Sequence, residues 1–157
     1  IAIDTDGLHR MSDYTQVAFW LKKTLREAGD KFTIVMMHHP VYSTAKGRQN
    51  PLMWLTFYGA MRDADVVFSG HDHNYARRTE YYKERFWKKE APTVFIATNA
   101  SQKNYPIKEN TRYDYSFSGE PVYEHISIQP NLLRIATYQL SSEKLLDEVL
   151  IHRLSTR

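Results

Sequence analysis

The histidines of this chain gather in two short clusters, and these clusters carry its clearest chemical signal. Four of the seven histidines lie there: the first cluster is VMMHHP at residues 35–40, and the second is GHDHNY at residues 70–75. Each follows an apolar, strand-like run, and a strand that opens into a histidine-bearing loop is a common way to present metal ligands. Neutral imidazole nitrogen is the commonest protein ligand for zinc, iron and similar ions. The clusters predict a metal site; the alternative is two groups of buried, hydrogen-bonded histidines without a metal.

The spacing of the second cluster adds a geometric expectation. His71 and His73 are two residues apart, so in an extended segment their side chains point the same way. In that arrangement they could bind one ion, or two ions a few ångströms apart.

The order of the two clusters resembles that in a known superfamily. V-x-x-H at residues 35–38, followed by His39 and Pro40, resembles the fourth motif of the calcineurin-like metallophosphoesterases, and G-H-x-H at residues 70–73 resembles the fifth. The purple acid phosphatase branch is the most similar, because there the last motif continues into an aromatic residue and an arginine, as Tyr75 and Arg77 do here. The resemblance extends over nearly the whole chain, since the C-terminal run is also similar to the closing strands of that domain.

The resemblance implies a metal-dependent phosphoester hydrolase, an acid-phosphatase-like phosphomonoesterase with a dinuclear site of zinc, iron or manganese. By the same resemblance, His38 and His71 would bind the second metal ion and His73 the first. A two-metal site binds a phosphate ester across both ions and lowers the pKa of a bound water, which then attacks phosphorus. Two alternatives stay open: a phosphodiesterase or nucleotidase of the same superfamily, and a catalytically inactive relative that binds a ligand or partner.

Three further motifs of the superfamily, which supply its carboxylate ligands, are absent from the sequence. There is no Gly-Asn-His, and the Gly-Asp pair at residues 29–30 is typical of a helix end. We therefore expect residues 1–157 to be the C-terminal portion of one catalytic domain, whose N-terminal half would be a partner outside this sequence. Without the bridging carboxylate, this portion alone is expected to be inactive.

Two residues beside the histidines are candidates for contact with substrate. His39 directly follows a predicted ligand and is expected to face the substrate or support the ligand. Where relatives often carry further histidines, this chain has Lys46-Gly47-Arg48, so Arg48 or Lys46 could clamp a phosphate oxygen. Both could equally be ordinary exposed basic residues. Asp72, between two predicted ligands, is expected to point away from the metals and orient a neighbour.

The elements that position these residues alternate in the first half of the chain. We expect a short strand at 1–4, a helix from Ser12 or Asp13 to about residue 28 stopped by Gly29, and a strand at 31–37 buried on both faces. A second helix from Pro51 to about residue 63 and a buried strand at 65–69 follow. This is the pattern of an α/β layer.

The pattern changes after the second cluster. Residues 93–98, 122–128, 132–140 and 145–154 are predicted strands, with hairpin turns at 129–131 and 141–142. Residues 99–119 are polar and irregular but rich in tyrosine, as in a flap over the substrate or a surface loop pinned by its aromatics. With the resemblance, the fold class is α/β: the C-terminal half of a four-layer α/β/β/α sandwich of two mixed sheets flanked by helices.

Composition narrows the possible partners. The hydrophobic fraction of 42% suits a packed core, and no run approaches the ~20 apolar residues that span a bilayer. With no cysteine, disulfides and thiolate metal sites are excluded. The net charge of +3 is mild, and the denser patch at 77–89 also holds acidic residues, so it is either a solvated face or a phosphate-attracting rim. We expect a phosphate-ester substrate and no nucleic acid; the resemblance favours a periplasmic or secreted location.

Overall fold

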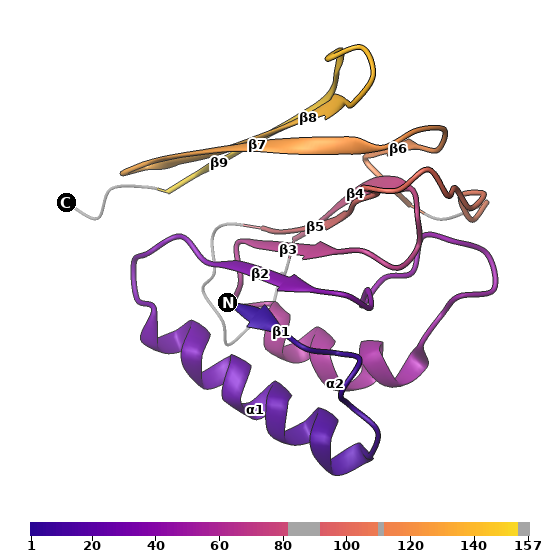
Figure 1. Ribbon diagram of the computed structural model, residues 1–157. Coiled ribbons are helices and arrows are strands. Elements are labelled where there is room, and N and C mark those ends of the chain that lie inside the picture. The colour runs from indigo at the N-terminus through magenta and orange to yellow at the C-terminus, as the bar shows by residue number, and fades with distance from the viewer. Residues whose placement is uncertain (82–91, 110–111, 154–157) are drawn as a thin grey trace.

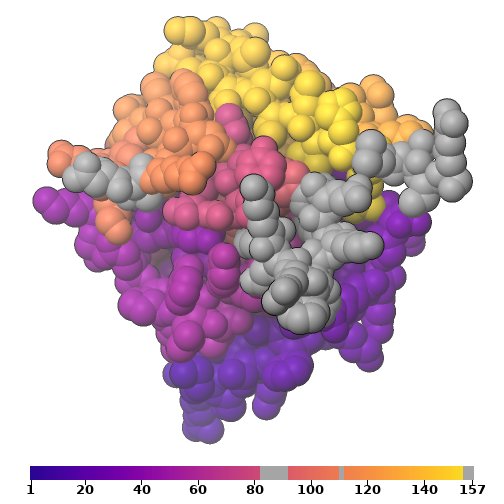
Figure 2. Space-filling model, turned by 180° about the vertical axis from the view of Figure 1, so that it is seen from behind, coloured from indigo at the N-terminus to yellow at the C-terminus, as the bar shows by residue number. Residues whose placement is uncertain are grey.

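The computed structural model describes residues 1–81, 92–109 and 112–153, which form three layers (Figure 1). The middle layer is a six-stranded sheet whose strands, in spatial order, are β1 (Ala2–Ile3), β2 (Ile34–Met37), β3 (Val66–Ser69), β5 (Thr93–Ala97), β4 (Tyr75–Glu80) and β6 (Tyr115–Phe117). Helices α1 (Met11–Glu27) and α2 (Pro51–Met61) cover one face. A three-stranded antiparallel sheet covers the other, with strands β7 (Val122–Gln129), β8 (Leu132–Gln139) and β9 (Leu145–His152). In the view from behind, this sheet forms one end of the molecule and the helices form the opposite end (Figure 2).

The parallel part of the large sheet sets the position of both histidine clusters. Strands β1, β2, β3 and β5 are parallel, and Met37 at the end of β2 pairs with Ser69 at the end of β3. The segments that leave these two strands therefore start side by side at the same edge of the sheet. Strands β4 and β6 are added in antiparallel orientation, so the sheet is mixed.

Helix α1 forms in the segment where the sequence predicts a helix, but its start differs from the expected one. Its buried residues are Tyr14, Ala18, Leu21 and Leu25. Arg10, not Ser12 or Asp13, occupies the N-cap; the Asp13 carboxylate accepts a hydrogen bond from the Arg10 amide at 2.8 Å, so it caps the helix from inside the first turn. At the other end Gly29 has a φ of 59°, the left-handed conformation that ends many helices.

Helix α2 begins as the sequence predicts, with Pro51 in its first turn. The side chain of Asn50 accepts hydrogen bonds from the amides of Leu52 and Met53 at 3.1 and 3.2 Å. Neither helix of the described residues is long and apolar enough to cross a lipid bilayer.

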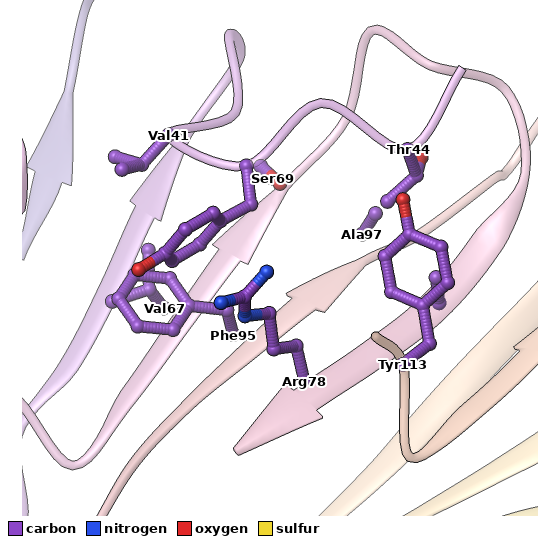
Figure 3. Close-up of a pocket in the computed structure, with 10 residues that line it drawn as sticks. Val41, Thr44, Val67, Ser69, Arg78, Phe95, Ala97 and Tyr113 are labelled. Atoms are coloured by element: carbon purple, nitrogen blue, oxygen red, sulfur yellow. The ribbon is translucent and has the colours of Figure 1, made fainter. Parts of the chain in front are cut away.

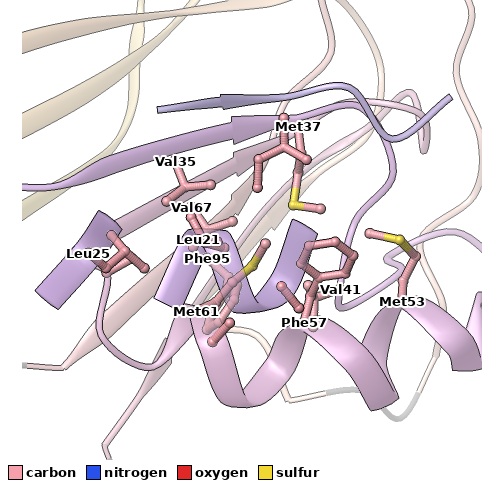
Figure 4. Close-up of a cluster of buried hydrophobic side chains, with 14 of the residues drawn as sticks. Leu21, Leu25, Val35, Met37, Val41, Met53, Phe57, Met61, Val67 and Phe95 are labelled. Atoms are coloured by element: carbon pink, nitrogen blue, oxygen red, sulfur yellow. The ribbon is translucent and has the colours of Figure 1, made fainter. Parts of the chain in front are cut away.

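Two apolar clusters hold the layers together. The first lies between the helices and the large sheet (Figure 4) and includes Leu21, Met53, Phe57, Val35 and Phe95. The second lies between the two sheets and is built around Tyr75, Ile96, Leu133 and Ile135, among others.

A polar clamp also joins the sheets. The carboxylate of Asp147 on β9 accepts hydrogen bonds from Arg77 Nε at 2.7 Å, from Arg77 Nη2 at 3.1 Å and from the Tyr75 hydroxyl at 2.9 Å. Arg77 also donates to Asp114 at 3.0 Å. Strand β4, which carries Tyr75 and Arg77, is thereby fixed to the second sheet.

Most predicted elements are present, and the differences have clear causes. Strand β2 is shorter than expected, and the prediction that it is buried on both faces is wrong, because Met36 is 53% exposed. Strands β4 and β6 were not predicted: β4 is rich in charge, and β6 lies within the stretch expected to be irregular. The hairpin turns near residues 130 and 141 are confirmed. Of the basic patch at 77–89, residues 82–89 lie outside the described residues, as does the end of the strand predicted to reach residue 154.

Candidate metal centre

Three histidines meet at the carboxyl ends of β2 and β3. His38 and His39 follow β2 directly, and the Gly70 amide, just after β3, donates to the carbonyl of His38 at 3.1 Å. His38 Nε2 lies 3.2 Å from His71 Nδ1. The ring centroids of His39 and His71 are 4.4 Å apart. Each of these three residues offers a ring nitrogen within 4.8 Å of the others, so together they could hold one metal ion.

The second cluster is a tight turn, not the extended segment that was assumed. His71 and His73 both have positive φ, at 67° and 50°, and the Asp72 amide donates to the carbonyl of Gly70 at 2.7 Å. The prediction of an extended segment, from which a shared side-chain direction was expected, is therefore wrong. Left-handed backbone is uncommon for residues other than glycine, and it is often found at functional sites.

His73 lies apart from the three clustered histidines. Its Nδ1 is 2.7 Å from the hydroxyl of Ser101, and its ring packs edge-on against Tyr105 with centroids 5.3 Å apart. Of the three predicted metal ligands, the structure thus brings His38 and His71 together and places His73 against the segment that follows β5.

Asp72, in the second cluster, is hydrogen-bonded to the loop that follows the first cluster. Its side chain is fully buried. Its Oδ2 accepts hydrogen bonds from the Ser43 hydroxyl at 2.9 Å, from the Ala45 amide at 3.2 Å and from both the amide and the hydroxyl of Thr44. As expected, the carboxylate orients neighbours; these belong to the loop that follows His38 and His39.

Arg48 reaches the histidines from the end of that loop. Its Nη2 lies 2.8 Å from His71 Nε2 and 3.2 Å from His71 Nδ1. Its guanidinium packs over the ring of Tyr105, with Cζ 4.7 Å from the centroid. Lys103 Nζ lies 5.0 Å from the same centroid, so two cations flank Tyr105 at the edge of the site. Lys46, the other basic candidate of this loop, is exposed.

His39 is held from the amino-terminal side. Thr5 Oγ1 accepts a hydrogen bond from the His39 amide at 3.0 Å and lies 3.1 Å from His39 Nδ1. An Asp6 carboxylate oxygen is 3.9 Å from the same ring nitrogen. Sequence reasoning did not identify Thr5 or Ser101 as site residues. Tyr105 belongs to the tyrosine-rich segment that was expected to be either a flap over the substrate or a surface loop.

The surroundings of His71 favour its neutral form. Burial, together with the positive charge of Arg48 and the nearby His39, lowers the pKa of His71 to about 4. A neutral imidazole keeps a ring nitrogen lone pair, which is the form that binds metals. The donor chemistry of the three clustered imidazoles therefore fits zinc, iron or manganese.

The cluster fits only part of a dinuclear centre. No carboxylate joins the three imidazoles among the residues that the structure describes. Asp72, the carboxylate nearest in sequence, uses one oxygen for the loop hydrogen bonds instead.

A small pocket lies over β3, β5 and β4 (Figure 3), and it shares Val67 and Phe95 with the apolar cluster on the helix side of the sheet. Thr44 and Tyr113 line it above the sheet, and Arg78 reaches into it from β4. None of the clustered histidines lines this pocket. The candidate site is therefore the open loop edge of the sheet.

Comparison with known proteins shows what this chain is similar to. Residues 3–75 match the model of the calcineurin-like phosphoesterase family, which covers both histidine clusters. This confirms the resemblance drawn from the sequence. A search of curated protein sequences returned no match.

The purple acid phosphatase PPD1 from seeds of yellow lupin (Lupinus luteus) has a similar structure, with a TM-score of 0.72 and 17% identity over 97% of this chain. At that identity the likeness shows the fold, and it confirms the predicted fold class. The chain spans 30% of the length of that phosphatase. Vps29 of Entamoeba histolytica complexed with zinc reaches a TM-score of 0.38 at 16% identity, over 74% of this chain and 52% of its own.

Proposed function

We propose that this chain is the histidine-bearing part of a metal-dependent phosphoester hydrolase. The observation that carries the proposal is the meeting of His38, His39 and His71 at the ends of two parallel strands, within sequence that matches the calcineurin-like phosphoesterases. In parallel α/β sheets, ligands bind at the carboxyl ends of the strands.

His38 and His71 would hold one metal ion, and His73 would contribute to a second. Bound metal ions neutralise charge on a phosphoryl group and lower the pKa of a coordinated water. Carboxylate ligands from outside this chain would complete the centre.

Arg48 would bind a phosphoryl oxygen, since its guanidinium already lies at the histidines and the Tyr105 ring supports it from one side. Its fork of donors suits the three free oxygens of a phosphomonoester. His39, held by Thr5, would face the leaving group or steady the neighbouring ligand.

The chain would act as the C-terminal portion of one catalytic domain. Apolar side chains on the facing sides of the two sheets remain uncovered: Met36 on β2 is 53% exposed, and Ile128 on β7 is 61% exposed. An N-terminal half that extends both sheets would cover them. By the family resemblance the whole protein would work in the periplasm or outside the cell, and this portion alone would be inactive.

The test is metal content and hydrolysis of the full-length protein, compared with its His71→Ala variant. His125→Ala is the matched control, because His125 is exposed on β7 in the second sheet. We expect bound zinc, iron or manganese and cleavage of a phosphomonoester in the wild type and the control, and loss of both in His71→Ala. Preference for a diester would place the protein among the phosphodiesterases instead. Metal-free, inactive wild-type protein, unchanged by added metal, would refute the proposal and favour a binding role.

A further inference from the structure

Two buried charged atoms beside the histidines face each other without forming a hydrogen bond. Arg48 Nε and Asp72 Oδ1 are 3.7 Å apart. Both atoms are buried, and neither has a hydrogen-bond partner among the described residues. Buried polar groups are nearly always paired, and an unpaired one in a charged side chain is costly. A small rotation of the Arg48 side chain would pair both atoms at once.

The arrangement of Asp72 makes it a fixed acceptor for such a rotation. Its Oδ2 is held by the hydroxyl of Ser43 and by backbone and side-chain donors of residues 44 and 45. The carboxylate therefore cannot turn toward Arg48. The two side chains already lie at ion-pair distance, so only the shorter, hydrogen-bonded contact requires movement of the arginine.

In the structure, the terminal Nη2 of Arg48 contacts the ring of His71. Nη2 lies 2.8 Å from His71 Nε2 and 3.2 Å from His71 Nδ1, the ring nitrogen that faces His38 Nε2 at 3.2 Å. A lone pair that accepts a hydrogen bond from guanidinium cannot bind a metal at the same time. The guanidinium is also permanently charged, so it repels a cation at this position.

We propose that Arg48 competes with metal binding: it contacts His71 while the ring is free, and once a metal holds His71 it withdraws from the ring and its 3.7 Å ion pair with Asp72 Oδ1 shortens to a hydrogen bond. The Tyr105 ring, with its centroid 4.7 Å from Cζ, supports the guanidinium in the position that the structure shows. The movement would clear the ligand nitrogen and leave the remaining donors of Arg48 facing the substrate. This inference rests on the metal site of the proposed function, and it assigns to Asp72 the role of positioning residue.

Metal affinity is the readout that tests this competition. Cobalt(II) is titrated into the full-length protein, and its absorption bands report binding without any need for activity. The set comprises wild type, Arg48→Gln, Asp72→Asn, the double variant and Arg134→Gln, a control for loss of one positive charge, since Arg134 lies on β8 and pairs with Glu148.

Removing the competing charge should tighten cobalt binding by Arg48→Gln about tenfold, because the guanidinium and the ion would otherwise share one ligand nitrogen. Arg134→Gln should bind as the wild type does. Asp72→Asn should bind more weakly than the wild type, since the displaced arginine loses its acceptor. In the double variant the Asp72→Asn substitution should no longer weaken binding, because no arginine remains to be displaced.

Three results would separate the possibilities. Equal affinity of wild type and Arg48→Gln would overturn the competition while leaving the metal site intact. Weakening by Asp72→Asn of the same size in both backgrounds would show a purely structural carboxylate and would also overturn the assignment. If Asp72→Asn does not fold, the Arg48→Gln comparison still decides. Absence of cobalt binding in every protein would refute the proposed metal site itself.

Discussion

The clamp at Asp147 offers a direct test of how the two sheets are held together. Asp147→Ala removes the acceptor of three hydrogen bonds: two from Arg77 and one from the Tyr75 hydroxyl. The side chains of Arg77 and Asp147 are only 15% and 8% exposed, so water cannot fully replace the lost partner. We expect the second sheet to be the first part of the fold to loosen.

The magnitude follows from the environment of the arginine left behind. Breaking a buried ion pair by removing one partner typically costs ~3–5 kcal/mol. Arg77 keeps its hydrogen bond to Asp114 at 3.0 Å, which favours the lower end, about 3 kcal/mol. For a domain of this size that corresponds to a fall of roughly 6–12 °C in the melting temperature.

Thermal and urea unfolding, followed by circular dichroism, would measure the effect. Glu148→Ala is the matched control, because Glu148 is the next residue on β9 and also pairs with an arginine, Arg134. This ion pair is much more exposed: the Glu148 side chain is 38% exposed and the Arg134 side chain is 34% exposed. Little change is expected there. A loss in Asp147→Ala no larger than in Glu148→Ala would refute the argument that burial, and not the count of ion pairs, determines the strength of this clamp.

Three smaller perturbations test local features of the fold. Burial raises the pKa of Glu124, so the folded state holds this proton more tightly than the unfolded chain and stability falls as pH rises above the usual value of 4.5. Glu124→Gln should therefore raise the melting temperature near pH 7 and leave it almost unchanged near pH 4; an equal gain at both pH values would contradict this. Gly29→Ala should destabilise the protein by about 1 kcal/mol because of its left-handed φ, whereas Gly59→Ala inside α2 should stabilise it by roughly 0.5–1 kcal/mol in the same denaturant titration. Asn50→Ala should cost about 1 kcal/mol through loss of the α2 cap, and an unchanged urea midpoint would show that the cap is dispensable.

The parallel half of the fold could be predicted because its sequence pattern and its burial agree. In α1, Leu21 and Leu25 are buried, whereas Trp20, at the same helical spacing, is 49% exposed. Strand β3 is buried along its whole length, as its sequence predicts. Strand β4 was missed because charge was taken as a sign of exposure. Arg77 instead lies under the second sheet with Asp147, and Arg78 packs over the ring of Tyr42 at 4.2 Å. Such partners are distant in sequence and leave no local signal.

The candidate site, too, was predicted only in part from the sequence. The family resemblance assigned His38 and His71 to one metal ion, and the structure brings these two side chains together. The orientation of His73 did not follow, because a left-handed backbone at two histidines is not visible in residue types. The contact between Arg48 and His71 depends on the path of a loop, which no spacing rule predicts.

The buried carboxylate of Asp72 limits how the sequence around this site can change in evolution. Its hydrogen bonds to residues 43–45 join two segments that lie nearly thirty positions apart in the chain, so the loop after β2 and the turn after β3 form one mechanical unit. Replacing either segment alone with that of a relative would introduce new side chains but break the hydrogen bonds between Asp72 and residues 43–45. We therefore expect substrate specificity to be exchanged between relatives only when the loop after β2 and the turn after β3 are transplanted together.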